Sequence, residues 1–537
     1  SSISRTTSYA AHMPELRTQP FSGPAGSSGI ALFGRPSLFS MLFLLALEAT
    51  LPNVLVYQPD DLYQGYSAGW YAPKDPGFSL PVASPSLTPN IDKIGLEGAK
   101  FTQAYTASGM CAPSRFALLT GRYASRGAYA VSKSSGRPAQ VTVPQSKLSG
   151  NDLTHNLPRA LKSVGYVTAH LGKWHLSSEE ALEELGCDSG VPTEYDCAYA
   201  VQQKSIEAAG FDYAKGVYIT NFNSCSSCAT RFSHNVEWLV AEALEVMDAA
   251  LGNSTPFFVY FNPTPPHGSD AKNALVDTSS STSLGPYYCT STPSGTVGGS
   301  WSATCESSLS SPPDYSAWCS SCSMRSRSSI WSDSRGSGGA KDRSLVSGVS
   351  WVDEGLGVLY DYLKESAALN GTIILALTDN GKAKGTVYEY GVRTVMHVRY
   401  PTAIPAMTSI STRVNNIDIV PSLFDLIGLN PTSYDTDGVS WAAIADGSAT
   451  ALTRSYLIVE MANDYGVINA SSGSGGDTKY IYQDMSSPNN LAASGVTTKY
   501  PAWGVSDQLF DLSSDGAEAL NLALSAAHAP VLAAYQA

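Results

Sequence analysis

The stretch NVLVYQPDD, residues 53–61, decides the fold class of this 537-residue chain. Its first six residues are mainly apolar and rich in valine, which predicts a buried strand, and the strand is followed by Asp60 and Asp61. The same order returns at TIILAL, residues 372–377, which is followed by Asp379. Continuous apolar strands are typical of a parallel sheet that is covered on both faces.

Other apolar strands alternate with helical stretches between these two segments. We expect strands at 101–105, 166–171 and 256–262, and helices at 90–97, 152–164, 236–251 and 349–368. Strands that alternate with helices imply an α/β fold, with a large, mostly parallel sheet flanked by helices. We assign this main domain to residues 51–445, since length alone suggests either several domains or one large domain with a smaller companion.

The last ninety or so residues differ in pattern from the main domain. Short strand candidates at 456–460 and 479–483 are followed by a turn at 511–516. This pattern predicts a small antiparallel α+β subdomain over residues 446–537.

Polar side chains follow several of the predicted strands. These residues are Asp60, Asp61, His267, Asp379 and Asn380. Because ligands of such folds collect at the carboxyl edge of the sheet, we expect these side chains to converge there. Taken singly, each aspartate could be only a helix cap or turn residue. Taken together, clustered carboxylates repel one another unless a cation is bound, and oxygen ligands favour calcium or magnesium over zinc.

Composition excludes one class of partner. The net charge is −13 and only 15% of the residues are charged, whereas nucleic-acid binding needs clustered lysine and arginine. The acidic balance also mildly disfavours a densely sulfated polymer as substrate, although a local basic pocket could overrule the global sign.

A decisive motif lies at residues 111–115, CAPSR, and continues as LTGR at residues 119–122. Here the chain resembles the type I sulfatase family of the alkaline phosphatase superfamily. Further segments follow in the order of that family, and the similarity extends from about residue 52 to 522: Asp60-Asp61, TPNID at 88–92, GKWH at 172–175, Pro266-His267, DNG at 379–381, KGT at 384–386 and DQLFDL at 507–512.

The resemblance implies a modified nucleophile and one calcium ion. Cys111 would be oxidised to formylglycine by a formylglycine-generating enzyme, and its hydrate would attack sulfur with one hydroxyl and release sulfate through the other. Pro113 fits the first turn of a helix, which would place residue 111 at an anion-favouring helix N-terminus. The implied calcium ligands are Asp60, Asp61, Asp379, Asn380 and residue 111.

The resemblance also implies roles for five further residues. Arg115 would hold the formylglycine hydrate, and Lys173 and Lys384 would bind sulfate oxygens. His175 would accept a proton during elimination. His267 would protonate the leaving alcohol or bind sulfate, with Lys384 as the competing donor. Asp379 could also help to deprotonate the attacking hydroxyl, while Glu389 and Arg393 are expected to be structural supports.

The cysteines and the glycosylation triplets indicate export. Setting Cys111 aside leaves 9 − 1 = 8 cysteines, an even number that suits disulfides better than a zinc ribbon, given the long separation of the two CxxC pairs. The eight are Cys187, Cys197, Cys225, Cys228, Cys289, Cys305, Cys319 and Cys322. The last four lie in a Ser/Gly-rich segment, 269–338, which we interpret as an insertion. Triplets at Asn253, Asn370 and Asn469 fit N-glycosylation.

Residues 1–50 are interpreted as a leader. The run LFSMLFLLAL at 38–47 follows Arg35, is too short to span a bilayer and is typical of a signal-peptide core, although a buried strand or helix is the alternative. We therefore expect a secreted protein, or one of the secretory-pathway lumen (extracellular or lysosome-like), without a stable membrane anchor.

The sequence therefore predicts a sulfuric ester hydrolase that acts on a small-molecule or saccharide sulfate, such as a carbohydrate or aryl sulfate. The alternatives are a phosphodiesterase or phosphonate monoester hydrolase of the same superfamily, or a non-catalytic binding protein on this fold. An aromatic, proline-rich loop between Asp61 and Thr88, with Trp70, Tyr71 and Phe78, is either a surface loop or a pocket rim.

Overall fold

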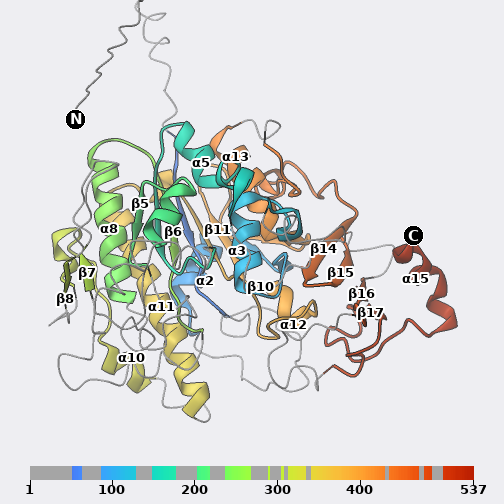
Figure 1. Ribbon diagram of the computed structural model, residues 1–537. Helices are drawn as coiled ribbons and strands as arrows, with labels where there is room; N and C mark the ends of the chain where they lie inside the picture. Colours follow the sequence, from blue (N-terminus) through green and yellow to red (C-terminus); the bar gives the residue numbers. More distant parts are fainter. Residues whose placement is uncertain are drawn as a thin grey trace, which may run out of the picture. The chain divides into compact units, whose positions relative to one another are not determined.

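The computed structural model of the chain is shown in Figure 1. It describes residues 51–62, 86–128, 148–176, 202–217, 236–267, 288–290, 304–306, 313–333, 340–429, 434–470, 477–486 and 500–537. All of these lie in one compact unit, Leu51–Ala537. The predicted leader, the aromatic loop with Trp70 and the four cysteines from Cys187 to Cys228 lie outside the described residues.

An eight-stranded sheet forms the centre of this unit, in the order β12-β2-β11-β9-β1-β6-β4-β5. The strands are β1 (Asn53–Tyr57), β2 (Ala99–Phe101), β4 (Val167–Gly172), β5 (Tyr213–Lys215), β6 (Phe257–Asn262), β9 (Thr372–Leu377), β11 (Met396–Arg399) and β12 (Thr408–Ile410). Neighbouring strands pair in parallel except at β11, which runs antiparallel to β9 and β2. Strands β1, β6 and β9 are buried along their whole length, as their continuous apolar runs predict.

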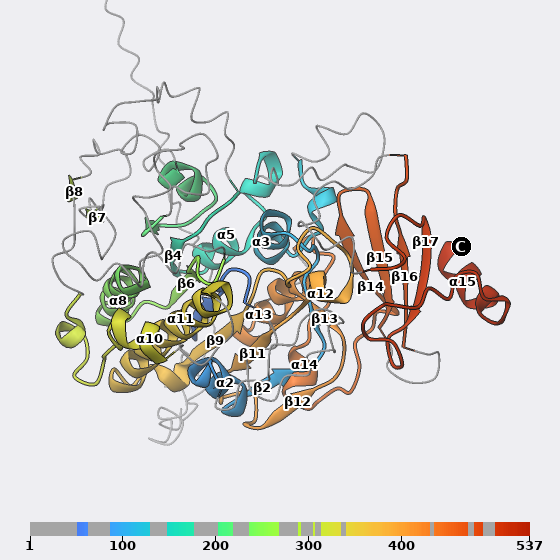
Figure 2. The ribbon, with the colours of Figure 1, turned by 90° about the horizontal axis from the view of Figure 1, so that it is seen from below.

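Helices cover both faces of the sheet, which confirms the predicted α/β class (Figures 1 and 2). Helices α2 (Pro89–Leu96), α8 (Val236–Gly252) and α11 (Ala340–Glu365) pack together on one face. Helices α3 (Cys111–Thr120), α5 (Leu157–Ser163) and α13 (Ile419–Ile427) lie on the other face. Both α3 and α13 end at a left-handed glycine, Gly121 and Gly428, the residue type that adopts this conformation without a Cβ clash.

A four-stranded antiparallel sheet forms near the C-terminus, as predicted. Its strands, in spatial order, are β14 (Tyr456–Met461), β15 (Asp464–Asn469), β16 (Thr478–Tyr482) and β17 (Asp507–Asp511). A small sheet joins β10 (Arg393–Thr394), β3 (Ala104–Tyr105) and β13 (Val414–Asn415). Other elements include β7 (Tyr288–Thr290), β8 (Thr304–Glu306), α10 (Arg327–Asp333), α12 (Glu389–Val392), α14 (Ala442–Ala445) and α15 (Ala529–Gln536).

Several predicted boundaries were wrong. The strand expected at 101–105 is divided between β2 and β3, which belong to different sheets. The helix expected at 152–164 begins only at Leu157, because the Asn156 side chain caps it by accepting from the Arg159 backbone N–H. The helix expected at 349–368 begins earlier, at Ala340.

The described part of segment 269–338 contains regular secondary structure. It contains the short strands β7 and β8, with Cys289 opposite Cys305 in their register, and helix α10. Cys319 and Cys322 form a disulfide, which confirms the disulfide interpretation for this CxxC pair. Within the described ranges, no helix has the length and apolar character needed to cross a membrane.

Candidate active site

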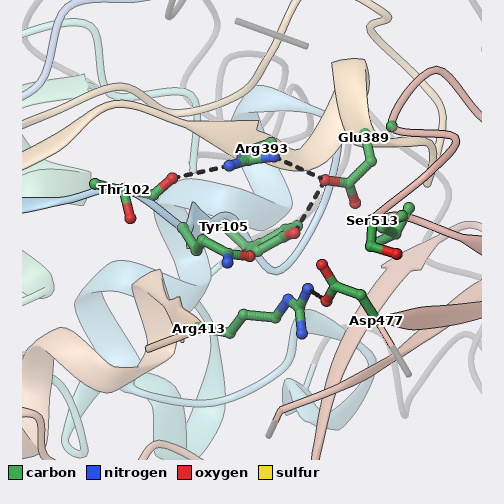
Figure 3. A pocket seen from close by; sticks show the side chains of 10 residues that line it. Thr102, Tyr105, Glu389, Arg393, Arg413, Asp477 and Ser513 are labelled. Atoms are coloured by element: carbon green, nitrogen blue, oxygen red, sulfur yellow. Dashed lines mark hydrogen bonds and ion pairs between the residues drawn. The ribbon is translucent and has the colours of Figure 1, made fainter. Parts of the chain in front are cut away.

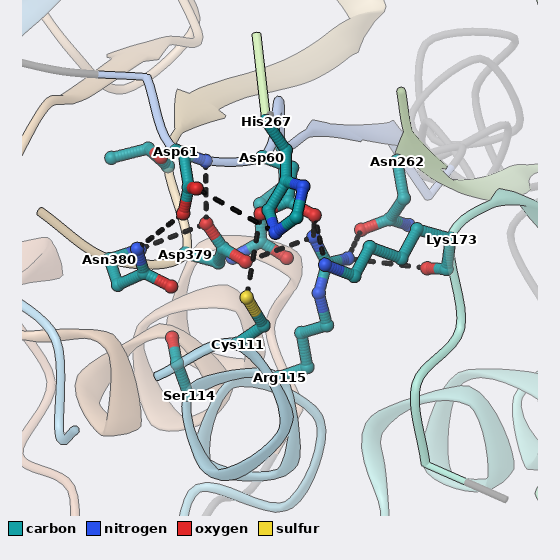
Figure 4. A network of polar contacts seen from close by, with 12 residues as sticks. Asp60, Asp61, Cys111, Ser114, Arg115, Lys173, Asn262, His267, Asp379 and Asn380 are labelled. Atoms are coloured by element: carbon teal, nitrogen blue, oxygen red, sulfur yellow. Dashed lines mark hydrogen bonds and ion pairs between the residues drawn. The ribbon is translucent and has the colours of Figure 1, made fainter. Parts of the chain in front are cut away.

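The carboxyl ends of β1 and β9 bring the predicted acidic residues together (Figure 4). The two strands pair in parallel, with Tyr57 opposite Ala376, so the residues that follow them meet at one edge of the sheet. Ligand atoms of Asp60, Asp61, Asp379 and Cys111 all lie within 4.8 Å of one another. The convergence that the strand ends predicted is therefore present.

Helix α3 delivers Cys111 to this edge. The helix begins at Cys111, and all ten of its residues are buried. Met110, the N-cap residue, makes no side-chain cap hydrogen bond, so the N–H groups of the first turn of α3 are not capped by it. The Cys111 thiol donates to Asp60 Oδ1 over 3.5 Å.

The Ser114 side chain fixes the first turn of α3 through hydrogen bonds to residues outside the helix. Its hydroxyl accepts from Thr106 Oγ1 over 2.7 Å and from Asn416 Nδ2 over 3.0 Å. The Asn416 side chain also accepts from the Ala107 backbone N–H. All four residues are buried, so this network holds the start of α3 against the chain that precedes it.

Asp379 organises the backbone of the acidic cluster. Its Oδ1 accepts from the backbone N–H groups of Asp61 and Asn380, each over 3.0 Å. Asp61 has a φ of 57°, a left-handed conformation that is uncommon outside glycine. Such strained positions are concentrated at functional sites.

The carboxylates are balanced by basic side chains in this structure. Lys173 pairs with Asp60, Lys384 Nζ lies 3.0 Å from Asp61 Oδ1, and Arg115 Nη2 lies 3.1 Å from Asp379 Oδ2. Three negative and three positive charges give 3 − 3 = 0 among these contacts.

The pKa values of Asp60 and Asp379 are shifted in opposite directions by their surroundings. Burial alone would raise the pKa of Asp60, but the charge of Lys173 and other nearby cations lowers it well below its usual value. Burial, together with the charge of Asp60, raises the pKa of Asp379 to about 6. Burial, together with both carboxylates, also raises the pKa of the Cys111 thiol, so an unmodified Cys111 is a poor nucleophile here.

The two predicted histidines are placed differently. His267 Nε2 lies 3.8 Å from Asp61 Oδ2, and its side chain is 43% exposed. His175 is partly buried, and its Nδ1 makes no hydrogen bond to any described group. Burial and the charges of Lys173 and Arg115 lower its pKa, so His175 lies within electrostatic reach of the cluster without being hydrogen-bonded into it through Nδ1.

Comparison with known proteins identifies the family. The sequence profile described as "Sulfatase" matches residues 67–429, which is more than half of the chain. The chain belongs to the sulfatase family. With it comes membership of the alkaline phosphatase superfamily, as the motifs predicted.

This sulfatase is similar to curated relatives over part of their length. It is 32% identical to human steryl-sulfatase over 191 residues, which cover 35% of this chain and 28% of the relative. It is 37% identical to mouse N-acetylgalactosamine-6-sulfatase over 232 residues, 42% of each chain. The matches thus span less than half the length of these relatives.

Solved structures share the fold of the sulfatase over most of its length. A protein of glycosaminoglycan metabolism in Bacteroides thetaiotaomicron matches with a TM-score of 0.57 and 18% identity, covering 91% of this chain and 98% of its own. A protein solved in complex with its substrate D-glucosamine-2-N,6-O-disulfate matches with a TM-score of 0.55 and 17% identity, covering 91% and 96%. At this identity the likeness concerns the fold alone.

Glu389 and Arg393 lie outside the acidic cluster of the sulfatase, in a separate polar region (Figure 3). Glu389 accepts from Tyr105 Oη over 2.9 Å and from Lys479 Nζ over 3.1 Å. Glu389, Arg393 and Arg413 line a cavity of ≈ 380 Å³ between the small sheet and the C-terminal sheet. Their contacts link these two sheets, in agreement with a supporting role.

Proposed function

We propose that the chain hydrolyses a sulfate monoester at the cluster formed by Asp60, Asp61, Asp379 and Cys111. The observation that carries this proposal is the convergence of their ligand atoms within 4.8 Å, with two lysines and one arginine paired to the carboxylates. Fixed positive charges in a buried site stabilise the negative charge that develops on sulfate oxygens during transfer.

The donor set fits a calcium ion. Asn380 Oδ1 is buried and has no hydrogen-bond partner among the described residues, although buried amide oxygens are almost always paired. A cation that accepts this oxygen and the aspartate oxygens explains why it is left open, and hard oxygen ligands favour calcium. Asp60, Asp61, Asp379, Asn380 and residue 111 would hold the ion, which would supply positive charge for the sulfate group.

The charge balance supports the same assignment. The three ion pairs of the site leave no net charge for an anionic substrate. A divalent cation would add two positive charges and thus make the site attractive to a sulfate ester. Lys173 and Lys384 would then be available to bind sulfate oxygens in place of the carboxylates.

The open side of the cluster supports a position for the alcohol group of the substrate. Cys111, Arg115 and Asp379 are buried, whereas the side chains of His267 and Lys384 are 43% and 20% exposed. His267 and Lys384 are therefore assigned to the leaving-group oxygen and the outer sulfate oxygens. Formylglycine at position 111 would supply the hydroxyl nucleophile from the buried side. His175, whose pKa is lowered by the charge of nearby Lys173, is assigned to accept the proton of the second hydroxyl of the formylglycine hydrate.

The proposal includes passage through the secretory pathway. The Cys319–Cys322 disulfide is consistent with an oxidising compartment, and Asn253 and Asn370 are exposed in their glycosylation triplets. Intact mass before and after enzymatic deglycosylation and reduction checks this part.

The deciding experiment is hydrolysis of 4-nitrophenyl sulfate and 4-nitrophenyl phosphate with calcium present. The protein is produced in a host that makes formylglycine, and the mass of residue 111 is measured in each sample. We expect preference for the sulfate, with turnover lost in Cys111→Ala and Cys111→Ser. Preference for the phosphate would assign the chain to phosphoryl transfer. Appreciable multiple turnover by Cys111→Ser would disprove the formylglycine nucleophile.

A further inference from the structure

Asn262 is a buried polar residue of the site that none of the sequence motifs contains. It is the last residue of β6, between the ends of β1 and β4, and its side chain faces Arg115 (Figure 4). Asn262 Oδ1 accepts from Arg115 Nη1 over 2.6 Å. The Asn262 backbone oxygen accepts from the Lys173 backbone N–H over 2.9 Å. One residue therefore contacts two of the basic residues of the site.

The guanidinium of Arg115 is held from two ends. Its Nη2 lies 3.1 Å from Asp379 Oδ2 and 3.7 Å from Asp60 Oδ2. Its Nη1 donates to Asn262 and, over 3.2 Å, to the Lys173 backbone oxygen. The carboxylates thus attract one nitrogen, while only neutral oxygens hold the other.

A neutral acceptor has a specific advantage at this position. A hydrogen bond to a neutral amide fixes the direction of the guanidinium and leaves its charge available for the substrate, whereas another carboxylate would offset that charge. The amide orientation of Asn262 is itself fixed, because Nδ2 donates to the Tyr260 backbone oxygen over 3.1 Å. Oδ1 therefore faces Arg115.

We propose that Asn262 is a positioning residue: by holding Arg115 Nη1, it keeps the guanidinium from moving closer to Asp60 than the 3.7 Å of its present contact. This inference rests on the proposed sulfate ester hydrolysis. It assigns to Asn262 no contact with the substrate. Its effect on the reaction passes through Arg115.

The chain offers a matched control for the test. Asn53 is also buried, at the other end of the neighbouring strand β1, where its Oδ1 accepts from the Phe257 backbone N–H over 3.2 Å. Asn53→Leu therefore removes a buried amide of the same kind from the same sheet, far along the strand from the cluster. Asn262→Leu removes the acceptor of Arg115, and Asn262→Asp keeps the acceptor but adds a charge.

The full chain and these three variants are assayed on 4-nitrophenyl sulfate, with the mass of residue 111 confirmed in each. We expect Asn262→Leu to lower kcat about 10- to 100-fold, as loss of an outer partner of a site group commonly does, with a smaller change in KM. Asn262→Asp should also lower kcat, although Arg115 stays in place in its crystal structure. Asn53→Leu should have the same kcat as the parent when kcat is expressed per folded molecule.

Equal kcat values for Asn262→Leu and Asn53→Leu would overturn the inference while leaving the proposed function intact. A parent that hydrolyses neither the sulfate nor the phosphate would instead contradict the proposed function. In that case the crystal structure of Asn262→Leu decides: a shift of Arg115 toward Asp60 supports the inference, and an unmoved Arg115 overturns it.

Discussion

Asn380 donates from its amide nitrogen to Asp61 Oδ1 over 2.6 Å, while the amide oxygen of the same side chain has no hydrogen-bond partner within the described part of the chain. The amide is thus half satisfied in a fully buried position. Leaving a buried polar group unpaired costs about 1–3 kcal/mol, so the missing partner should be detectable as a stabilising ligand.

Calcium should stabilise the folded chain. At a concentration about 100-fold above its Kd, a ligand that binds only the native state raises the free energy of unfolding by about 2.7 kcal/mol. Thermal denaturation in calcium and in chelator measures this change. Asp379→Asn should remove most of the difference, whereas Asp446→Asn, at an exposed position, should retain it. An equal melting temperature for the parent with and without calcium would contradict the metal site.

Gly172→Ala should impair activity, whereas Gly165→Ala should not. Both glycines are left-handed, with φ of 88° and 95°, so alanine at either costs about 1–2 kcal/mol. Only at Gly172 would a Cβ lie 2.1 Å from the Asn262 backbone oxygen, while at Gly165 nothing lies within 4 Å. The clash separates the ends of β4 and β6, where Lys173 is anchored. Urea denaturation and kcat, measured for both variants, give the comparison, and equal kcat losses would refute it.

Lys479→Met should destabilise the fold strongly. Lys479 is fully buried and pairs with Glu389 Oε1 over 3.1 Å and Glu518 Oε1 over 2.9 Å. Its loss leaves two buried carboxylates together, which should cost about 3–5 kcal/mol in denaturant unfolding. Lys162→Met breaks a solvent-exposed pair with Asp212 and should cost at most about 1 kcal/mol.

The pH dependence of the Lys479→Met effect has a defined sign. Burial, with Lys479 opposing it, raises the pKa of Glu518 to about 7 in the parent. Without the lysine, protonation of this carboxyl is the remaining way to relieve the repulsion from Glu389. The destabilisation should therefore be larger at pH 8 than at pH 6, and the opposite order would show that the two carboxylates are not coupled.

His170→Phe should make the fold less sensitive to acid. Burial lowers the pKa of His170 from 6.5 to about 3, so between these values the unfolded chain binds a proton that the folded chain does not. Stability is therefore lost as pH falls, by up to about 1.4 kcal/mol per pH unit for this group. The ring packs edge-on to Trp174 and Tyr260, an environment that accepts phenylalanine. Unfolding free energies at pH 7 and pH 4.5 should show the variant gaining on the parent; a constant difference would refute this.

The sequence was most informative where hydrophobic pattern and motif coincide. The apolar runs at β1 and β9 place Asp60 and Asp379 at one edge of the sheet, and this placement needs no knowledge of side-chain contacts. Strand β15, DYGVIN, was missed because its polar residues and glycine interrupt the apolar pattern; its partners in the sheet stabilise it.

Asn262 could not be recognised in the same way. An asparagine at the end of a strand is common, and its importance depends on a contact with Arg115, 147 positions away in the chain. The placement of Cys111 at the start of α3 was predictable from Pro113. The hydrogen bond between Ser114 and Asn416 was not predictable, because Asn416 comes from a distant segment of the chain.

The burial of α3 has a consequence for the order of events in biosynthesis. All five residues from Cys111 to Arg115 are buried in the folded chain, and Cys111, Ala112, Ser114 and Arg115 are each at most 1% exposed. Ser114 is tied to Asn416, which is synthesised about three hundred residues later. Under the proposed function, an enzyme that oxidises the cysteine would reach this segment only before that later part has emerged and docked. Maturation of the proposed nucleophile would therefore compete with folding, and a variant that folds faster would carry less of the oxidised residue.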